Sequence, residues 1–362
     1  MRCIYRCFVL IACISSGNAF GFFTINRVPR RIDGRNWEVA FLGVAGIRAW
    51  GYNACGAKVN VLQILDTDAC SEQLFKPTAQ VRESLFIPTF RYFLPHNFSV
   101  SCTLPVLFRK VSDFRLNPVD DAGALPASPI TVQTAWSRTG ISDCITLAEW
   151  SRPFDTKNKV PLTQGIRIDM QLGPSFPTGV RSDETLLLGD AFGGDGAYGV
   201  HAAFGINVQT VHEPFIWGVR TEVTKIGSVT RDRSIRIDPI NEQARARVRA
   251  ALHSGVVVRQ TVYCALHDIV QWLSLGVGYR YEYQARNHLV LCSDQYSQDV
   301  ANKDPWLYAT KTNDITFVVR YDPVPPQEQV LAPRYGLYFR QPLGGCRSIQ
   351  EQTFSFDISF DF

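Results

Sequence analysis

Large apolar and polar residues alternate one by one along the final stretch of the chain, from Thr353 to Phe362. The apolar side chains share one face: Phe354, Phe356, Ile358, Phe360 and Phe362. Serine and aspartate residues lie between them and share the opposite face. Alternation with a period of two is typical of a β-strand that separates two different environments. In water, an edge strand with such an aromatic face would promote aggregation, so the pattern indicates that another medium covers this face.

The same alternation recurs in long runs upstream, for example over 98–108, 166–172 and 200–208. Runs of this length match a tilted membrane-spanning strand better than the five or six residues of a typical soluble strand. About twelve strands are expected in total, at 37–50, 84–94, 98–110, 141–153, 161–173, 197–210, 214–225, 256–266, 271–285, 312–322, 333–341 and 347–362. An even number is what bacterial single-chain barrels require.

The connections between these strands alternate between short and long for most of the chain. The long ones cover about 51–83, 111–140, 174–196, 226–255 and 286–311. Short periplasmic turns and long extracellular loops are typical of outer-membrane barrels. The sequence therefore predicts an all-β fold: a transmembrane antiparallel up-and-down β-barrel of about twelve strands, whose phenylalanine stripe meets lipid while Asp357 and Asp361 face a wet lumen.

The first residues predict export. A basic start (MRCIYR), an apolar run (CFVLIACI) and a small-residue end (SSGNA) indicate a signal peptide over 1–19, cleaved after Ala19. Residues 20–362 then form a single outer-membrane barrel domain with long extracellular loops. An alternative is a lipid-anchored start, because Leu10-Ile11-Ala12-Cys13 resembles a lipoprotein box.

Composition and cysteine spacing exclude several classes of protein. Apart from the N-terminus, no stretch approaches the roughly 20 apolar residues of a membrane helix. A net charge of +4 on 362 residues is too weak to predict nucleic-acid binding. The cysteines show no metal-ligand spacing, and no metal or cofactor is expected. Cys55 and Cys70 flank one predicted loop and could bridge it; Cys102, Cys144 and Cys264 read as small apolar fillers.

Three segments carry a family resemblance: NFSVSCTLPVLF (97–108), GISDCITLAEWSRPF (140–154) and SFPTG (175–179). In order and spacing they resemble motifs of the outer-membrane transporters associated with the phenol meta-degradation pathway. Those proteins carry Gly-Leu-Gly-Asp where this chain has 140–143, and Leu-Pro-Thr-Gly where it has 176–179. The resemblance implies a barrel distantly like the long-chain fatty-acid transporter, which moves small, often aromatic or apolar, molecules. A terminal Phe362 on an aromatic strand likewise resembles the signal that the barrel-assembly machinery recognises.

Charged residues at inward-facing positions are the candidate site. Arg91, Arg167, Arg220 and Arg280 belong to four different predicted strands, and Asp169, Glu222 and Glu282 follow three of them two residues later. This spacing places opposite charges one above the other on the lumen face. The charges predict either a constriction that selects solutes or a salt-bridged lumen that satisfies buried charge. Inward arginines slightly outnumber carboxylates, which predicts a modest preference for anionic or polarisable aromatic solutes.

Two loop segments admit competing interpretations. The Ala- and Arg-rich stretch 243–253 is predicted to form a short helix, either an ordinary solvated one or part of a basic patch that contacts lipopolysaccharide. The stretch 189–199 is rich in glycine, but it lacks the ligand count of a calcium loop and the context of a nucleotide site. It is expected to be a loop that leads into a strand.

The sequence thus predicts an outer-membrane channel for small solutes, including hydrophobic or aromatic compounds, with the bilayer, lipopolysaccharide and the assembly machinery as partners. Catalysis is not expected, because no serine near the six histidines has a nucleophile-elbow context. The alternatives are a structural or adhesive barrel without transport, a barrel enzyme and a secreted β-sandwich.

Overall fold

The computed structural model describes residues 36–52, 55–60, 75–118, 135–156, 163–182, 191–210, 215–237, 245–270, 272–323 and 332–362. Its barrel strands are β1 (Trp37–Tyr52), β3 (Phe75–Phe93), β4 (Phe98–Thr103), β5 (Val106–Pro118), β6 (Trp136–Ile141), β7 (Cys144–Asp155), β8 (Thr163–Phe176), β9 (Gly199–Thr210), β10 (Phe215–Ile226), β13 (Val257–Val270), β14 (Leu273–Gln284), β16 (Thr310–Tyr321), β17 (Ala332–Cys346) and β18 (Ser348–Asp361). The short strand β2 (Lys58–Asn60) pairs with the end of β1 in the same sheet. A separate three-stranded sheet outside the barrel wall consists of β11 (Ser228–Arg236), β12 (Arg245–His253) and β15 (His288–Leu291).

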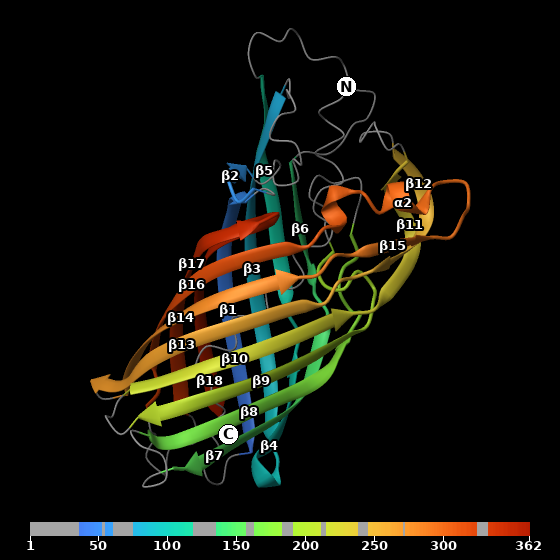
Figure 1. The fold of residues 1–362 in the computed structure, drawn as a ribbon. Coiled ribbons are helices and arrows are strands. Elements are labelled where there is room, and N and C mark those ends of the chain that lie inside the picture. Colours follow the sequence, from blue (N-terminus) through green and yellow to red (C-terminus); the bar gives the residue numbers. More distant parts are fainter. Residues whose placement is uncertain are drawn as a thin grey trace.

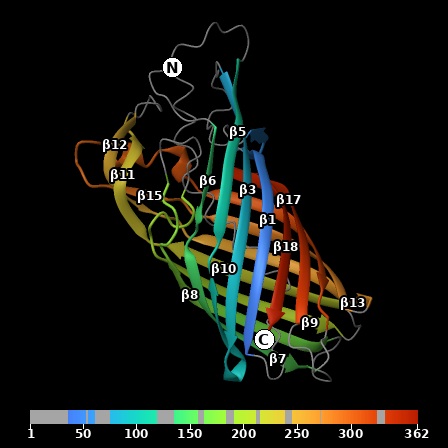
Figure 2. The same ribbon diagram turned by 180° about the vertical axis from the view of Figure 1, so that it is seen from behind.

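Antiparallel pairing closes these strands into one barrel (Figure 1). The last strand, β18, pairs with β1, and β1 pairs on its other edge with β3. Figure 2 shows β17, β18, β1, β3 and β5 side by side in this part of the wall. Closure removes the exposed edge that the aromatic final strand would otherwise present. The barrel has twelve strands when β4 with β5 and β6 with β7 are each counted as one, which confirms the predicted fold class.

Two wall strands are interrupted at the same height. The break between β4 and β5 falls at Leu104-Pro105, and the break between β6 and β7 falls at Ser142-Asp143. Pro105 has no backbone N–H for the ladder, and its carbonyl accepts a 2.7 Å bond from the Ser142 N–H. The expected single strand over 98–110 is therefore wrong: it is two strands, because proline interrupts it.

Beyond this break, the chain between β8 and β9 covers the free edge of β6. The Val180 N–H donates to the Ile141 carbonyl at 3.0 Å, and the Phe192 N–H donates to the Val180 carbonyl at 2.7 Å. The loop connection is thus built into the wall and reaches the barrel interior. We call the end of the barrel with the long connections the loop end, and the opposite end the turn end.

The predicted alternation is present on β18. Phe354 is 54% exposed on the outer face, whereas its neighbour Ser355 is fully buried on the inner face. Phe356 and Phe362 are also exposed on the outside, and Ile358 and Phe360 are partly exposed. Aromatic rings of adjacent strands contact each other near the turn end, including Trp37 with Tyr92 and the row Trp272, Tyr321, Tyr335 and Phe356. Such rows are typical of the aromatic girdle of a membrane barrel.

The predicted helix over 243–253 is wrong. Residues 245–253 form β12, the middle strand of a three-stranded sheet with β11 and β15 that lies beside the loop end (Figure 1). Val248, Ala250 and Leu252 are buried on one face, while Arg247 and Arg249 are exposed on the other. This period of two determined the structure in spite of the helix propensity of alanine and arginine.

No helix among the described residues is long and apolar enough to span a membrane.

The predictions on the N-terminus and on the cysteines are only partly covered by the described residues. The predicted signal peptide, Cys13 and Cys70 lie outside the described residues, so the bridge to Cys55 stays a prediction. Cys102 and Cys144 lie on the neighbouring strands β4 and β7, with their sulfur atoms 3.5 Å apart.

Candidate channel interior

Ion pairs between neighbouring strands line one side of the barrel interior. Arg280 on β14 and Asp314 on β16 are register partners, and the guanidinium donates from Nε at 3.0 Å and from Nη2 at 2.8 Å to the carboxylate. Arg259 on β13 lies opposite Glu282 on β14 and donates to it at 2.5 Å. Register partners are the closest side-chain neighbours in a sheet, so register selects these pairs.

The predicted pairs two residues apart are partly right. Arg220 does contact Glu222 at 2.8 Å. Arg280 pairs with Asp314 and Glu282 pairs with Arg259, so the nearest ion pairs of these two side chains run across strands. Asp169 accepts hydrogen bonds from Asn207 at 2.6 Å and from Ser151. The predicted pairing within a strand is therefore present for Arg220 and Glu222. Arg280 and Glu282 instead form their closest ion pairs with residues of neighbouring strands.

A second group of ion pairs lies nearer the turn end. Arg91 contacts Glu38 at 2.8 Å and Glu149 at 3.2 Å, and so links β3 to β1 and β7. Arg334 contacts Asp361 at 2.8 Å and Glu38 at 3.6 Å. Sequence reasoning missed Glu149 and Arg334 as lumen residues. The alternation would have found Glu149, because it lies between the outward-facing Ala148 and Trp150.

The buried charges of the barrel strands balance. Eight described arginines are buried there: Arg91, Arg109, Arg220, Arg259, Arg280, Arg320, Arg334 and Arg340. Eight described carboxylates match them: Glu38, Glu83, Glu149, Glu282, Asp314, Glu351, Asp357 and Asp361. The predicted excess of arginine is therefore absent among these buried side chains.

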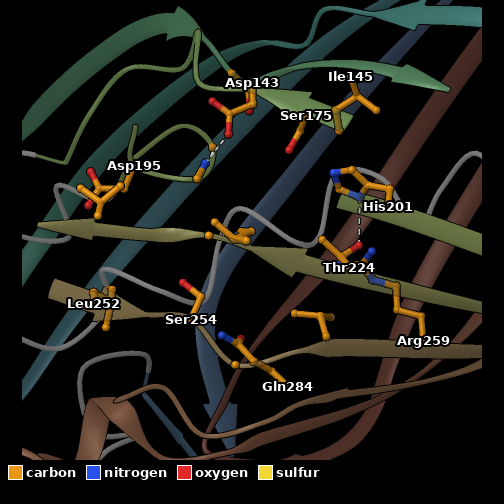
Figure 3. A pocket seen from close by; sticks show the side chains of 18 of the residues that line it. Asp143, Ile145, Ser175, Asp195, His201, Thr224, Leu252, Ser254, Arg259 and Gln284 are labelled. Atoms are coloured by element: carbon orange, nitrogen blue, oxygen red, sulfur yellow. Dashed lines mark hydrogen bonds between the residues drawn. The ribbon is translucent and has the colours of Figure 1, made fainter. Parts of the chain in front are cut away.

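Two neighbouring cavities lie within the charged interior. The one at the loop end is bordered by β7 to β10, β13, β14, the outer sheet and the segment 193–195 (Figure 3). The second is lined by wall strands. Four residues line both cavities: Ile145, His201, Thr224 and Arg259. His201 Nδ1 and Thr224 Oγ1 lie 3.0 Å apart, and Figure 3 shows the two side chains facing each other.

Four of the seven predicted lumen residues line these cavities, and three do not. Arg91, Arg220 and Glu222 line the second cavity, and Glu282 lines the first. Arg280 is buried in its ion pair, while Arg167 and Asp169 are half-buried. Among the described residues, no group of three His, Cys, Asp or Glu side chains could hold a metal ion. A role of the seven residues in solute selection stays a prediction.

Buried side chains pack together in the interior on the side of β10, β13, β16 and β17. Tyr263, Val318 and Tyr338 form a buried cluster there. A Cβ atom at Gly218 would lie 2.5 Å from Cζ of Tyr263, so the ring needs a glycine on the neighbouring strand. Large side chains therefore fill this part of the lumen.

An apolar patch interrupts the polar interior on the opposite side. Leu42 and Val44 on β1, Leu85 and Ile87 on β3, and Leu107 on β5 form one buried cluster. The cluster also contains Phe192 of the connection between β8 and β9, which is only 2% exposed. Phe192 thus inserts into the barrel from a segment outside the strands.

Comparison with solved structures identifies the architecture. The COG4313 outer-membrane channel from Pseudomonas putida F1 matches with a TM-score of 0.58 and 12% identity, over 93% of this chain and 100% of that one. This chain has the fold of a bacterial outer-membrane barrel. The toluene transporter TodX of Pseudomonas putida is less similar, with a TM-score of 0.43 and 10% identity over 98% of this chain and 96% of that one. No family model matches this outer-membrane barrel, and no curated protein matches it significantly.

Proposed function

We propose that the protein is a channel of the bacterial outer membrane through which small solutes pass. One observation carries the proposal: two neighbouring cavities lined by charged and polar side chains lie inside a closed barrel whose outer face is apolar. A barrel that only anchored or scaffolded would have no use for such cavities. The similarity to an outer-membrane channel over nearly the whole chain supports the fold on which this function rests.

The solutes that we propose are neutral, and include hydrophobic or aromatic compounds. Arginines and carboxylates are equal in number on the buried faces of the described barrel strands, and many pair within 4 Å. Paired charges produce a weak net field, so such a lumen gives little advantage to either sign of ion.

Membrane orientation and partners follow from the same proposal. The apolar outer face contacts lipid, the loop end faces outward and the turn end faces the periplasm. Arg247 and Arg249 on the exposed face of β12 are candidates for contact with lipopolysaccharide phosphates. Export by residues 1–19 and recognition of the stripe from Phe354 to Phe362 by the assembly machinery complete the proposal.

An enzymatic role has one geometric candidate. Ser274 Oγ lies 3.3 Å from His267 Nδ1 near the turn end. Ser274 is buried and faces Arg320 on β16 across the sheet, and neither Ser274 nor His267 lines either of the two cavities. We therefore propose a channel without this catalytic role, and a serine-directed fluorophosphonate probe should leave Ser274 unlabelled in the folded protein.

Liposome swelling tests the proposal against an inert structural barrel. Purified protein should need detergent, migrate faster on gels before heating than after, and make liposomes permeable to small neutral solutes. The rate should fall steeply with solute size, because the interior is partly filled by side chains. Folded protein that leaves the liposomes impermeable to every solute would favour the structural barrel, and protein soluble without detergent would favour a β-sandwich.

A further inference from the structure

The apolar patch beside the charged lumen already holds one aromatic ring. Phe192 packs against Leu42, Val44, Leu85, Ile87 and Leu107, and together these five aliphatic residues form what we call the cradle. The same strands carry the charged residues Glu38, Glu83 and Arg91 at other inward positions. The cradle is therefore an aliphatic patch within an otherwise charged inner face. Burying an aliphatic patch inside a polar lumen is favourable only if an apolar group covers it.

Two cations lie over the ring that covers the cradle. The guanidinium carbon of Arg109 is 5.2 Å from the centre of the Phe192 ring, and that of Arg138 is 5.6 Å away. Both distances are in the range of cation–π attraction, which an aliphatic group cannot provide. Arg109 also pairs with Glu83 at 3.1 Å, but among the described residues no carboxylate pairs with Arg138, whose Nη1 is buried without a hydrogen-bond partner. The environment is therefore specific for an aromatic face.

The segment that carries Phe192 separates the cradle from open space. Gly193, Gly194 and Asp195, directly after Phe192 in sequence, line the cavity at the loop end. Gly193 has a φ of 139°, and a Cβ there would lie 2.5 Å from the Asp143 carboxylate, so only glycine fits. The segment is fastened mainly by polar contacts: Gly194 N–H donates to Asp143, and Asp195 pairs with Arg231 at 2.6 Å. Moving Phe192 toward the cavity breaks its 2.7 Å backbone bond to Val180 but no hydrogen bond between two wall strands.

We propose that the cradle is a binding site for a neutral monocyclic aromatic solute, which displaces Phe192 and lies under Arg109 and Arg138. The proposal rests on the proposed channel function and names a step within it. Phe192 acts as an internal competitor: it closes the site when no solute is present and yields to a ring of the same size. A phenol fits the site because it offers one ring, a π face and no net charge.

Calorimetry with two matched ligands tests the site. Phenol and cyclohexanol are similar in size and polarity, but only phenol has a π face. Phe192→Ala should bind phenol at least about tenfold more tightly than the wild type, because the competing ring is gone. It should bind cyclohexanol about fivefold more weakly than phenol. Adding Arg138→Gln to Phe192→Ala should bring the two ligands within about twofold of each other.

Controls keep this test interpretable. Phe176→Ala removes an exposed phenylalanine just before the same connection and should bind phenol like the wild type. Should Phe192→Ala fail to assemble, Phe192→Leu keeps the apolar packing but loses the ring, and should still bind phenol severalfold more tightly than the wild type. Equal affinity of the wild type and the Phe192 variant, equal binding of phenol and cyclohexanol by that variant, or tighter binding of benzoate than phenol would overturn the proposal.

Parallel conductance measurements separate this site from the channel function. A barrel that conducts ions but shows no preference for phenol would support the channel function and contradict the binding site. If Phe192→Ala binds phenol more tightly but no variant conducts ions, the binding site would be supported and the channel function contradicted.

Discussion

The inward-facing side chains on the two sides of the lumen are covered in different ways. On β10, β13, β14, β16 and β17, charged side chains pair with the strand next to them, as Arg280 does with Asp314 and Arg259 with Glu282. On β1, β3 and β5, aliphatic side chains are covered by Phe192 from outside the strands. On the first side the charged residues find their partners on wall strands, whereas on the second side the aliphatic residues are covered by a connecting segment. The comparison indicates that the charged side supports the barrel, and we propose that the apolar side exchanges its occupant.

Breaking an ion pair of the charged side should have the largest effect. Arg280→Ala leaves Asp314 buried with the more distant Arg340, at 3.7 Å, and should lower the free energy of unfolding by about 3 kcal/mol. Urea unfolding in lipid vesicles, followed by the gel mobility of the folded barrel, measures this change. The double variant Arg280→Met with Asp314→Leu should recover most of the loss, because neither charge is then left unpaired.

Arg247→Ala is the matched control for this experiment. Arg247 is exposed on β12, outside the barrel wall, and its removal should change the stability by less than about 0.5 kcal/mol. If Arg280→Ala and Arg247→Ala unfold at the same urea concentration as the wild type, the charged side does not support the barrel.

The outer face of β18 should have the next largest effect. Replacing Phe360 and Phe362 by serine removes apolar contact with lipid, at about 1 kcal/mol for each partly exposed ring. The amount of heat-modifiable barrel in isolated membranes should fall severalfold. Phe154→Ser on the outer face of β7 serves as the comparison for a general lipid-facing position. An equal fall for Phe154→Ser would show that the final strand has no special part in assembly.

Ion selectivity should respond more weakly. Because buried charges balance among the described barrel strands, the reversal potential of the wild type across a salt gradient should lie near zero. Arg220→Ala leaves Glu222 with Arg259 at 3.9 Å beside the second cavity, and should shift the cation-to-anion permeability ratio about twofold toward cations. Unchanged reversal potentials in this variant would mean that the permeating ions do not pass Glu222.

The smallest effect is expected at the wall break. The sulfur atoms of Cys102 and Cys144 are 3.5 Å apart, so copper phenanthroline should oxidise the two thiols to a disulfide without changing conductance. Mass spectrometry of a peptide digest detects the cross-link, and Cys102→Ser abolishes it. A cross-link to another cysteine would contradict the pairing of β4 with β7.

Sequence patterns predicted the barrel better than the lumen. Alternation determines which face of a strand a residue occupies. The sequence therefore predicted the strands, the aromatic stripe on β18 and the burial of Arg91, Arg220 and Arg280. The partner of Arg280 could not be predicted, because it depends on the register between β14 and β16, which alternation does not specify. Phe192 was missed for a different reason: it belongs to a connection, and periodicity contains no information on where a connection folds.

Accessibility of the lumen to a reagent during conductance recording tests the central claim most directly. Thr224 lines both cavities, whereas Thr221 on the same strand has the opposite, outward parity. Each is replaced by cysteine in a variant that carries serine at the native cysteines, and a charged methanethiosulfonate reagent is added during single-channel recording. Discrete conductance steps should fall when Thr224→Cys is modified and stay constant for Thr221→Cys. Folded protein that conducts nothing, or conductance that Thr224→Cys modification leaves unchanged, would contradict a channel through this interior.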